Sequence, residues 1–150
     1  MNIRVAYQGD LKSIEECINS AYKRYIDRIG IKPAPMLADY NKAIESDKTY
    51  VLEDSELGVV GVLVLVISKG KFLLENVAIH TSAQGKGYGK ALLQLAEKIA
   101  VELEFDYIEL YTHEKMNENI SLYQRIGYEI FDRIHESGYS RVYMKKSVKG

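Results

Sequence analysis

The sequence contains a single cysteine, two prolines, no tryptophan and no excess of charge of one sign. Cys17 has no second cysteine to pair with, so an internal disulfide is excluded. The start M-N-I-R-V lacks the apolar core of a signal peptide, and together with the lack of disulfides this indicates a cytoplasmic protein. The longest apolar run, residues 58–67, is too short to span a bilayer, so we expect no membrane segment.

Charge and histidine content exclude further classes of partner. The 20 basic and 21 acidic residues give a net charge of -1, which provides no general attraction to nucleic acid or to acidic membranes. His80, His113 and His135 are far apart in the sequence, and neither an H-x-x-x-H nor a C-x-x-C pair is present. We therefore expect no nucleic-acid partner and no metal site.

The length and the hydrophobic pattern predict one domain with a mixed sheet. A chain of 150 residues suits a single domain over residues 1–150, and no linker or repeat interrupts it. The residue patterns predict strands at 3–6, 49–53, 59–67, 71–79, 105–112, 128–135 and 139–146, and helices at 11–29, 36–45, 90–103 and 117–126. Consecutive short strands favour antiparallel pairing, whereas the helix after residue 89 favours a crossover to a parallel neighbour.

Residues 71–95 combine a buried strand, a glycine-rich loop and the start of a helix. Apolar residues of both parities at 72–79 are typical of a strand covered on both faces. In the loop, Gly85, Gly87 and Gly89 allow unusual backbone angles and a close approach to a ligand. Lys86 and Lys90 add positive charge, and the free N–H groups at the start of the helix favour phosphate oxygens. This stretch therefore predicts a phosphate-bearing ligand.

Three kinds of phosphate loop have glycines at similar spacing. A Walker loop needs glycine at the position of Gln84 and serine or threonine at that of Ala91, so it is excluded. A dinucleotide fingerprint needs G-x-G-x-x-G after the first strand of a domain, whereas this loop gives G-x-G-x-G from Gly85. The remaining pattern, Q-x-x-G-x-G from Gln84 through Gly87 to Gly89, resembles the coenzyme A pyrophosphate loop of the GCN5-related N-acetyltransferase superfamily.

A second segment carries the same resemblance. Residues 117–128, N-E-N-I-S-L-Y-Q-R-I-G-Y, are similar to the E-N-x-x-L-Y-x-x-x-G-[YF] segment of that superfamily. The two matches stand in the family's order with a strand between them, and the resemblance covers residues 51–146. It implies an α/β fold with a mixed, mostly antiparallel seven-stranded sheet and helices on both faces. The implied order is strand, two helices, three strands, helix, strand, helix and two strands.

The resemblance implies acetyl-CoA as the co-substrate and assigns it to particular residues. Main-chain groups expected to bind the pantetheine arm are those of Val77, Ala78 and Ile79. The pyrophosphate is expected on the loop made of Gln84, Gly85, Lys86, Gly87, Tyr88, Gly89 and Lys90. Asn119, or else Asn117, is expected to contact the pantetheine arm, because Met116 stands where the family commonly has its asparagine.

Acetyl transfer to an amine also needs an acid and a base. Tyr123 stands at the position of the family's general-acid tyrosine and is expected to protonate the departing thiolate. An alkyl amine with a pKa of about 10 must first lose a proton. Glu75, a carboxyl group in the middle of an apolar strand, is the first candidate base, because burial raises the pKa of such a group. His113, Glu109 and a chain of water molecules are the alternatives.

The acceptor side is less well defined by the sequence. The residues expected to shape an acceptor pocket, because the corresponding segment overhangs the active site in the resembled family, are Tyr25, Arg28, Met36 and Tyr40. In the last hairpin, Tyr139 and Arg141 either line this pocket or belong to a solvated strand face, and the solvated face is the simpler expectation.

These features together predict an N-acetyltransferase. It moves the acetyl group of acetyl-CoA to a primary amine of a small molecule, by direct attack in a ternary complex. A peptide or protein N-acetyltransferase and a non-catalytic coenzyme A binding module are the alternatives. A homodimer is possible, because members of the resembled family often pair through their C-terminal strands.

Overall fold

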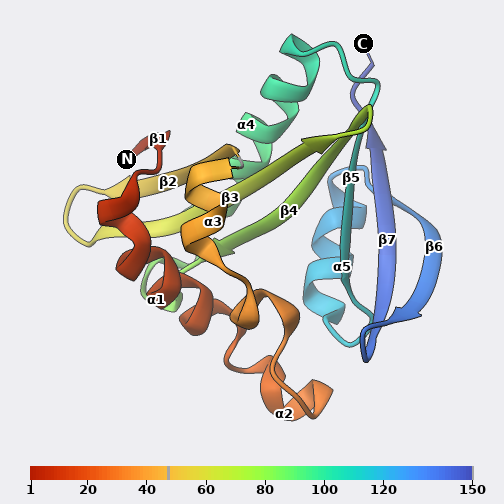
Figure 1. Cartoon of the computed structure of the whole chain (residues 1–150), viewed down its shortest axis with the longest axis horizontal. Helices are drawn as coiled ribbons and strands as arrows, with labels where there is room; N and C mark the ends of the chain where they lie inside the picture. Colours follow the sequence, from red (N-terminus) through yellow and green to blue (C-terminus); the bar gives the residue numbers. More distant parts are fainter. Residues whose placement is uncertain (47, 150) are drawn as a thin grey trace.

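The computed structural model describes residues 1–46 and 48–149, which form an open sheet flanked by helices (Figure 1). The strands are β1 (Asn2–Val5), β2 (Lys48–Asp54), β3 (Gly58–Ser68), β4 (Lys71–Ile79), β5 (Tyr107–His113), β6 (Glu129–Glu136) and β7 (Tyr139–Ser147). The helices are α1 (Leu11–Tyr22), α2 (Tyr25–Ile29), α3 (Tyr40–Ser46), α4 (Tyr88–Glu102) and α5 (Asn117–Arg125). Short 3-10 turns are η1 (Gln8–Asp10), η2 (Ala34–Leu37) and η3 (Thr81–Ala83).

The strands of the described residues form a seven-stranded sheet in the order β1-β2-β3-β4-β5-β7-β6. β4 and β5 are parallel and α4 connects them, whereas the other neighbours are antiparallel. The predicted mixed, mostly antiparallel sheet is therefore confirmed, and each strand begins and ends within two residues of its predicted range.

Helices cover both faces of this sheet, as predicted. On one face, Ile14 and Ile18 of α1 pack in a buried cluster with Val62 of β3. On the opposite face, Leu92 of α4 packs in a second cluster with Leu63 of β3. Val62 and Leu63 serve different clusters because successive strand residues point to opposite faces. In Figure 1, α1 and α3 accordingly lie on one side of the strands, with α4 and α5 on the other.

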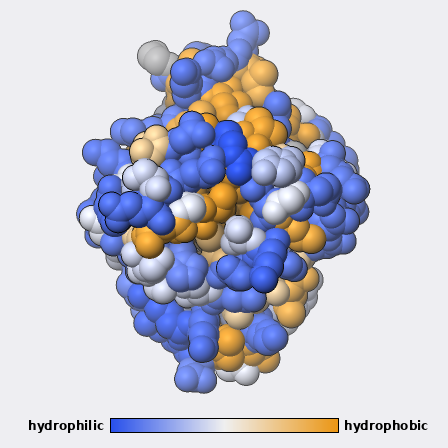
Figure 2. Space-filling view, turned by 90° about the vertical axis from the view of Figure 1, so that its left-hand side faces the viewer, coloured by the Kyte–Doolittle hydropathy of each residue, from blue (hydrophilic) through white to orange (hydrophobic). Residues whose placement is uncertain are grey.

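The apolar faces of the helices are buried against the sheet, and the outer surface is mostly hydrophilic. Figure 2 shows the surface on the side that lies on the left in Figure 1. Hydrophilic residues cover most of this side, and apolar atoms are visible in a hollow near the centre. In the described part of the chain, no helix is long and apolar enough to cross a membrane.

The N-terminal helices differ from the prediction. The helix predicted for 11–29 is divided into α1 and α2, and Gly30 ends α2 with a φ of 93°, as a C-terminal glycine does. The helix predicted for 36–45 is replaced by η2 and α3. Pro33 and Pro35 restrict the backbone before and inside η2. The Asp39 side chain accepts a hydrogen bond from the N–H of Lys42 at 3.1 Å, so α3 begins after Asp39.

A β-bulge interrupts β4 at Glu75. Leu65 of β3 pairs with Leu74 and Val64 pairs with Asn76, which leaves Glu75 as the extra residue. Because of the extra residue, side chains at even-numbered positions of β4 face one side of the sheet before the bulge and the other side after it. Leu74 belongs to the cluster under α4, whereas Ala78 belongs to the cluster under α1. Glu75 and Asn76 therefore lie where the strand changes its two faces.

Candidate active site

The glycine loop ends at the start of α4 with a backbone that favours glycine. Gly85 and Gly87 have φ angles of 83° and 81°, and an added Cβ at either position would meet no atom within 4 Å. Gly87 precedes the first turn of α4, which has no side-chain cap and no acidic residue. The first N–H groups of a helix have no partner inside it, so this end suits a phosphate oxygen.

Asp54, at the end of β2, ties this loop to the β2–β3 turn. Its carboxylate accepts hydrogen bonds from the Tyr88 hydroxyl at 2.5 Å and from Lys86 Nζ at 3.3 Å. It also accepts the backbone N–H groups of Glu56 and Leu57. The Tyr88 hydrogen bond, with these N–H groups, lowers the pKa of Asp54. Lys86 is thus part of the support of the loop.

A cavity that we call the loop cavity lies against the glycine loop. It is lined by residues 77–79 of β4, by residues 83–85 and 87–89, and by parts of α1, α2 and α5. The residues predicted to hold coenzyme A that line it are Val77, Ala78, Ile79, Gln84, Gly85, Gly87, Tyr88, Gly89, Asn119 and Tyr123. Lys86 and Lys90, also predicted, are not among the lining residues.

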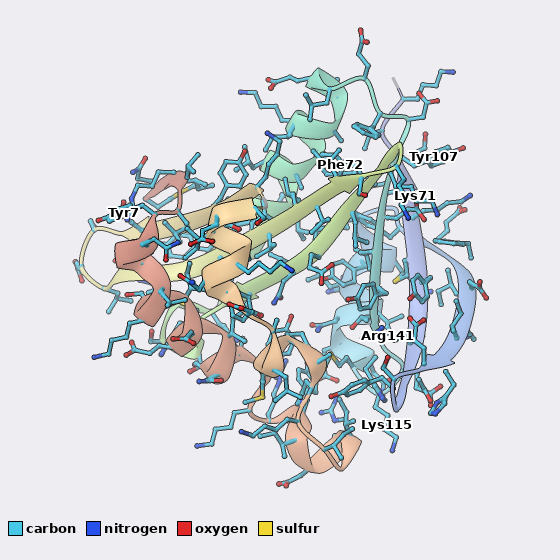
Figure 3. All side chains as sticks on the ribbon, viewed as in Figure 1. Tyr7, Lys71, Phe72, Tyr107, Lys115 and Arg141 are labelled. Carbon is cyan, nitrogen blue, oxygen red and sulfur yellow. The ribbon has the colours of Figure 1, made fainter. Side chains whose placement is uncertain are left out.

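A second cavity, which we call the gap cavity, lies where β4 and β5 separate. The two strands pair at Leu73 with Glu109 and at Leu74 with Leu110. The cavity begins at the last of these pairs, between residues 74–77 of β4 and 110–113 of β5. Residues of η2, α1, α3, α5 and β7 contribute to its other walls. In Figure 3, Phe72 and Tyr107 lie at the paired end of the strands, and Arg141 lies towards the opposite end.

A buried hydrogen-bond network forms one wall of the gap cavity. The Tyr22 hydroxyl donates to Asn76 Oδ1 at 2.7 Å, and Asn76 Nδ2 donates to the Tyr40 hydroxyl at 2.8 Å. The Tyr40 hydroxyl in turn donates to the carbonyl of Pro35 at 2.5 Å. This network joins α1, β4, α3 and η2, and burial raises the pKa of Tyr22 and of Tyr40. Both phenols are therefore hydrogen-bond donors at neutral pH.

Glu75 lines the gap cavity from the β4 bulge. The Tyr111 hydroxyl on β5 donates to Glu75 Oε1 at 3.3 Å across the opening between the two strands. Burial, and then the neighbouring Glu75 carboxyl, raise the pKa of Tyr111 to about 12. Glu75 is thus a carboxyl group inside the cavity, in contact with a phenol that stays protonated.

The two other candidate bases are placed less favourably. His113 lines the gap cavity, but its Nδ1 accepts the backbone N–H of Lys115 at 3.1 Å, and burial lowers its pKa. A neutral imidazole in this arrangement carries its proton on Nε2, which is then a donor. Glu109 lines neither cavity and pairs with Lys145 across the β5–β7 ladder.

The loop cavity and the gap cavity share Tyr22, Val77, Asn119 and Tyr123. Tyr123, on α5, has 8% of its surface exposed, and burial raises its pKa, so its hydroxyl is a proton donor at neutral pH. Asn119 lies one turn earlier on α5, whereas Asn117 lines neither cavity. The four shared residues therefore mark the point where the two cavities meet.

The residues predicted for the acceptor pocket are not all brought together. Tyr40 lines the gap cavity, and Tyr25 lines the loop cavity instead. Arg28 and Met36 line neither cavity. Arg28 forms an ion pair with Glu118 at 2.6 Å, which attaches α2 to the start of α5.

The sequence matches a known domain over more than half of its length. Residues 45–130 match the model of the acetyltransferase (GNAT) domain. The chain belongs to the GNAT acetyltransferase family. The resemblance predicted from the glycine loop and from residues 117–128 is thereby confirmed.

Solved GNAT structures share the fold along nearly the whole chain. An IAA acetyltransferase from Bacillus cereus has a TM-score of 0.70 and 21% identity, covering 97% of this chain and 98% of that one. The PaiA N-acetyltransferase from Thermoplasma acidophilum in complex with coenzyme A has a TM-score of 0.74, 20% identity and coverages of 97% and 98%. For the ribosomal-protein-S18-alanine N-acetyltransferase from Escherichia coli the values are 0.73, 13%, 99% and 94%. No curated protein sequence matches.

Several lining residues of this GNAT domain were not singled out in the sequence. These are Tyr22, Asn76 and Tyr111, which line the gap cavity. Tyr139 and Arg141 also line it, which is the less favoured of the two interpretations that the sequence left open for them. Asn76 carries a signal, because it is a polar residue within an apolar strand and neighbours Glu75. The tyrosines look like core residues in the sequence, and only the structure shows that they share one cavity. Among the described residues, no group of three His, Cys, Asp or Glu side chains is arranged to hold a metal ion.

Proposed function

We propose that this GNAT domain is an acetyl-CoA-dependent N-acetyltransferase that acts on a primary amine of a small molecule. The observation that carries the proposal is the junction of the two cavities at Tyr22, Val77, Asn119 and Tyr123. A thioester held along the loop cavity and an amine held in the gap cavity meet there in one ternary complex, which is the arrangement that direct transfer needs.

The loop side suits coenzyme A. The uncapped start of α4 and the backbone around Gly85 and Gly87 suit the pyrophosphate. Residues 77–79 lie beyond the last β4–β5 pair, so their backbone is available to an extended pantetheine arm on that side. Asn119 stands at the end of this path, and we assign it the contact with the arm in preference to Asn117.

Acetyl-CoA supplies the acetyl group as an activated thioester, and the side chains at the junction move the protons. Glu75 takes one proton from the ammonium group of the acceptor, and the neutral nitrogen forms a C–N bond to the acetyl carbon. As the C–S bond breaks, the Tyr123 hydroxyl gives its proton to the sulfur, which leaves as the thiol. The second amine proton restores the Tyr123 hydroxyl, and the proton on Glu75 passes to water.

A contact beside the gap cavity supports a small acceptor over a peptide. The Tyr139 hydroxyl at the start of β7 donates to the carbonyl of Lys32 at 2.6 Å. This bond joins the β6–β7 hairpin to the segment before η2, and we propose that a peptide chain would have to pass between these two segments. Pro33 and Pro35 stiffen that segment. A peptide acceptor requires this contact to open.

A thiol-release assay with acetyl-CoA tests the proposal. Amino acids, polyamines, aminoglycosides and short peptides are offered as acceptors, with coenzyme A binding measured separately by calorimetry. Turnover of a small amine but not of peptides supports the proposal. Turnover of peptides alone supports the peptide N-acetyltransferase, and coenzyme binding without turnover of any amine supports the non-catalytic binding module.

Other features predicted from the sequence stay predictions. These are the single domain over residues 1–150, the cytoplasmic location and the homodimer. In β6, the edge strand of the sheet, Phe131 and Ile134 are exposed, so this edge is where a second copy would pair.

A further inference from the structure

The gap cavity carries side chains of both charge types. Asp39 and Glu75 are its carboxyl groups, and Arg141 is the cation among its described lining residues. The Asp39 side chain is engaged at the start of α3, where it accepts the N–H of Lys42. Glu75 on β4 and Arg141 on β7 are thus opposite charges among the lining residues, in addition to Asp39 at the start of α3.

Arg141 is held in a defined position and does not move freely in solvent. Its side chain is 17% exposed, and its Nη1 donates to Glu136 Oε1 at 3.0 Å. Its Cζ lies 4.5 Å from the ring centroid of Tyr111 and 5.6 Å from that of Tyr139. Glu136 also accepts a hydrogen bond from Tyr143, so the carboxylate that orients Arg141 is itself held. A guanidinium group has five N–H donors in a planar fork, which suits two oxygens of an oxyanion.

His113 lies beside Arg141 and adds a second donor. The two residues are paired across the β5–β7 ladder, and both line the gap cavity. The Lys115 N–H donates to His113 Nδ1, so the neutral ring carries its proton on Nε2. The His113 ring packs edge to face against Tyr139, with centroids 6.2 Å apart. This end of the cavity therefore offers a cation and an N–H group to an anion.

Glu75 defines the other end of the same cavity. The Tyr111 hydroxyl contacts Glu75, while the face of the Tyr111 ring carries Arg141. One tyrosine thus separates the carboxyl group from the guanidinium. Glu75 is on the strand that continues to Val77 at the junction with the loop cavity, whereas Arg141 is on β7, farther along the sheet. An amine next to Glu75 faces the junction, and a second group of the same molecule reaches Arg141.

We infer that the acceptor is a primary amine that also carries an oxyacid anion, a carboxylate or a phosphate group, bound by Arg141 and His113. This inference rests on the proposed acetyltransferase function and adds the chemical class of its acceptor. Apolar walls at Ala34, Leu110 and Met116 suit a short carbon chain between the two groups. A polyamine fits less well, because its second ammonium group would meet the Arg141 guanidinium.

Matched acceptors test the inference. A series of α-, β- and γ-amino acids is compared with the corresponding amides, with the amines that lack the acid group, and with aminoalkyl phosphates of the same chain length. We expect kcat/KM for the best acid to exceed that for its amide by about 10- to 100-fold, the value of a charge-assisted contact. The comparison of carboxylate with phosphate identifies which oxyanion is used.

Variants assign this preference to Arg141. In Arg141→Gln, the ratio of kcat/KM for the acid to kcat/KM for its amide should fall towards one. Arg141→Lys keeps the positive charge but lacks the planar set of N–H donors, so it should retain part of the preference for the acid over the amide. This variant still tests the inference if Arg141→Gln does not fold. The matched control is Arg133→Gln, which removes the same charge from the exposed face of β6 and should change nothing.

Binding measurements separate the two proposals. The acid series is titrated by calorimetry into the protein with coenzyme A present. Acids that bind through Arg141 without being acetylated would overturn the acetyltransferase function but support the anion site. Acetylation of amides or polyamines as fast as acids, unchanged in Arg141→Gln, would leave the enzyme in place and overturn the inference.

Discussion

The loop cavity and the gap cavity meet at Tyr123 but are formed by different parts of the chain. The loop cavity is made largely by a continuous stretch of backbone, from the end of β4 through the glycines to α4. The gap cavity is made by side chains from elements far apart in the sequence, such as Tyr22, Asn76 and Arg141. In the proposed function, the loop cavity holds acetyl-CoA and the gap cavity holds the acceptor.

This difference predicts which substrate each substitution should affect. A change of backbone conformation on the loop side should affect acetyl-CoA and leave the acceptor KM unchanged. A change of side chain on the gap side should do the opposite. The predictions below test that division, first at the junction and then on each side.

Tyr123→Phe should have the largest effect, because Tyr123 belongs to both cavities. Loss of a general acid lowers kcat by about 100-fold or more. The KM for acetyl-CoA and that for the acceptor should change little, since the ring is retained. Steady-state thiol release measures all three constants.

Tyr128→Phe is the matched control for Tyr123→Phe. The two rings pack edge to face with centroids 5.7 Å apart, and the Tyr128 hydroxyl is buried with no hydrogen-bond partner among the described residues. Its removal should therefore leave kcat unchanged and preserve or raise stability. Equal losses of kcat in both variants would mean that packing, and not proton donation, is what Tyr123 provides.

Gly87→Ala should weaken acetyl-CoA binding by up to about tenfold. Left-handed backbone costs a residue with a Cβ about 1 to 2 kcal/mol, so the free loop should relax to another conformation and must return to this one when the coenzyme binds. Gly70→Ala is the control, since Gly70 has a φ of 75° in the β3–β4 turn and equally open space around it. Both variants should lose similar stability in thermal unfolding. Only Gly87→Ala should change the Kd of coenzyme A, and the acceptor KM should stay the same in both.

Asn76→Ala should act mainly on the gap side. It removes the acceptor of the Tyr22 hydroxyl and the donor to the Tyr40 hydroxyl, which keeps its bond to the carbonyl of Pro35. This should lower the free energy of unfolding by about 2 kcal/mol and raise the acceptor KM several-fold. The acetyl-CoA KM should be unchanged. Thr49→Val is the control, because it removes a buried hydrogen bond to the carbonyl of Ala43. Ala43 lines the gap cavity, but the Thr49 side chain lines neither cavity. This control variant should lower stability without a change in either KM.

The same difference explains what the sequence predicted. The spacing of Gln84, Gly87 and Gly89 predicted a glycine loop before a helix, because local backbone conformation depends on residues that are close in the sequence. Strand positions followed for the same reason. The gap side depends on contacts between residues that are distant in the sequence. Of the residues predicted for an acceptor pocket, Tyr40 lines the gap cavity, whereas Arg28 does not and pairs with Glu118. Glu75 was singled out in the sequence as a carboxyl group in an apolar strand. The bulge at Glu75 and its contact with Tyr111 are seen only in the structure.

Asp54→Asn should have the smallest effect on catalysis. The variant keeps the shape of the side chain but weakens its hold on Lys86 and Tyr88, so the acetyl-CoA KM should rise only a few-fold, with the acceptor KM unchanged. Stability should depend on pH as well. The pKa of Asp54 is lowered in the folded state, so its contribution to stability is present above the ordinary pKa of about 3.9 and is lost as pH falls through the folded value.

The stability difference between wild type and Asp54→Asn should therefore narrow as the pH is lowered below about 4. Asp10→Asn is the control that separates the pH dependence of stability from the effect of Asp54 on the glycine loop. The pKa of Asp10 is also lowered, chiefly by its hydrogen bonds from Arg4, and Asp10 lies away from both cavities. It should show the same narrowing with pH in chemical denaturation and no change in acetyl-CoA KM. If Asp10→Asn raised that KM as much as Asp54→Asn does, general loss of stability would explain both, and the loop would not depend on the β2–β3 turn.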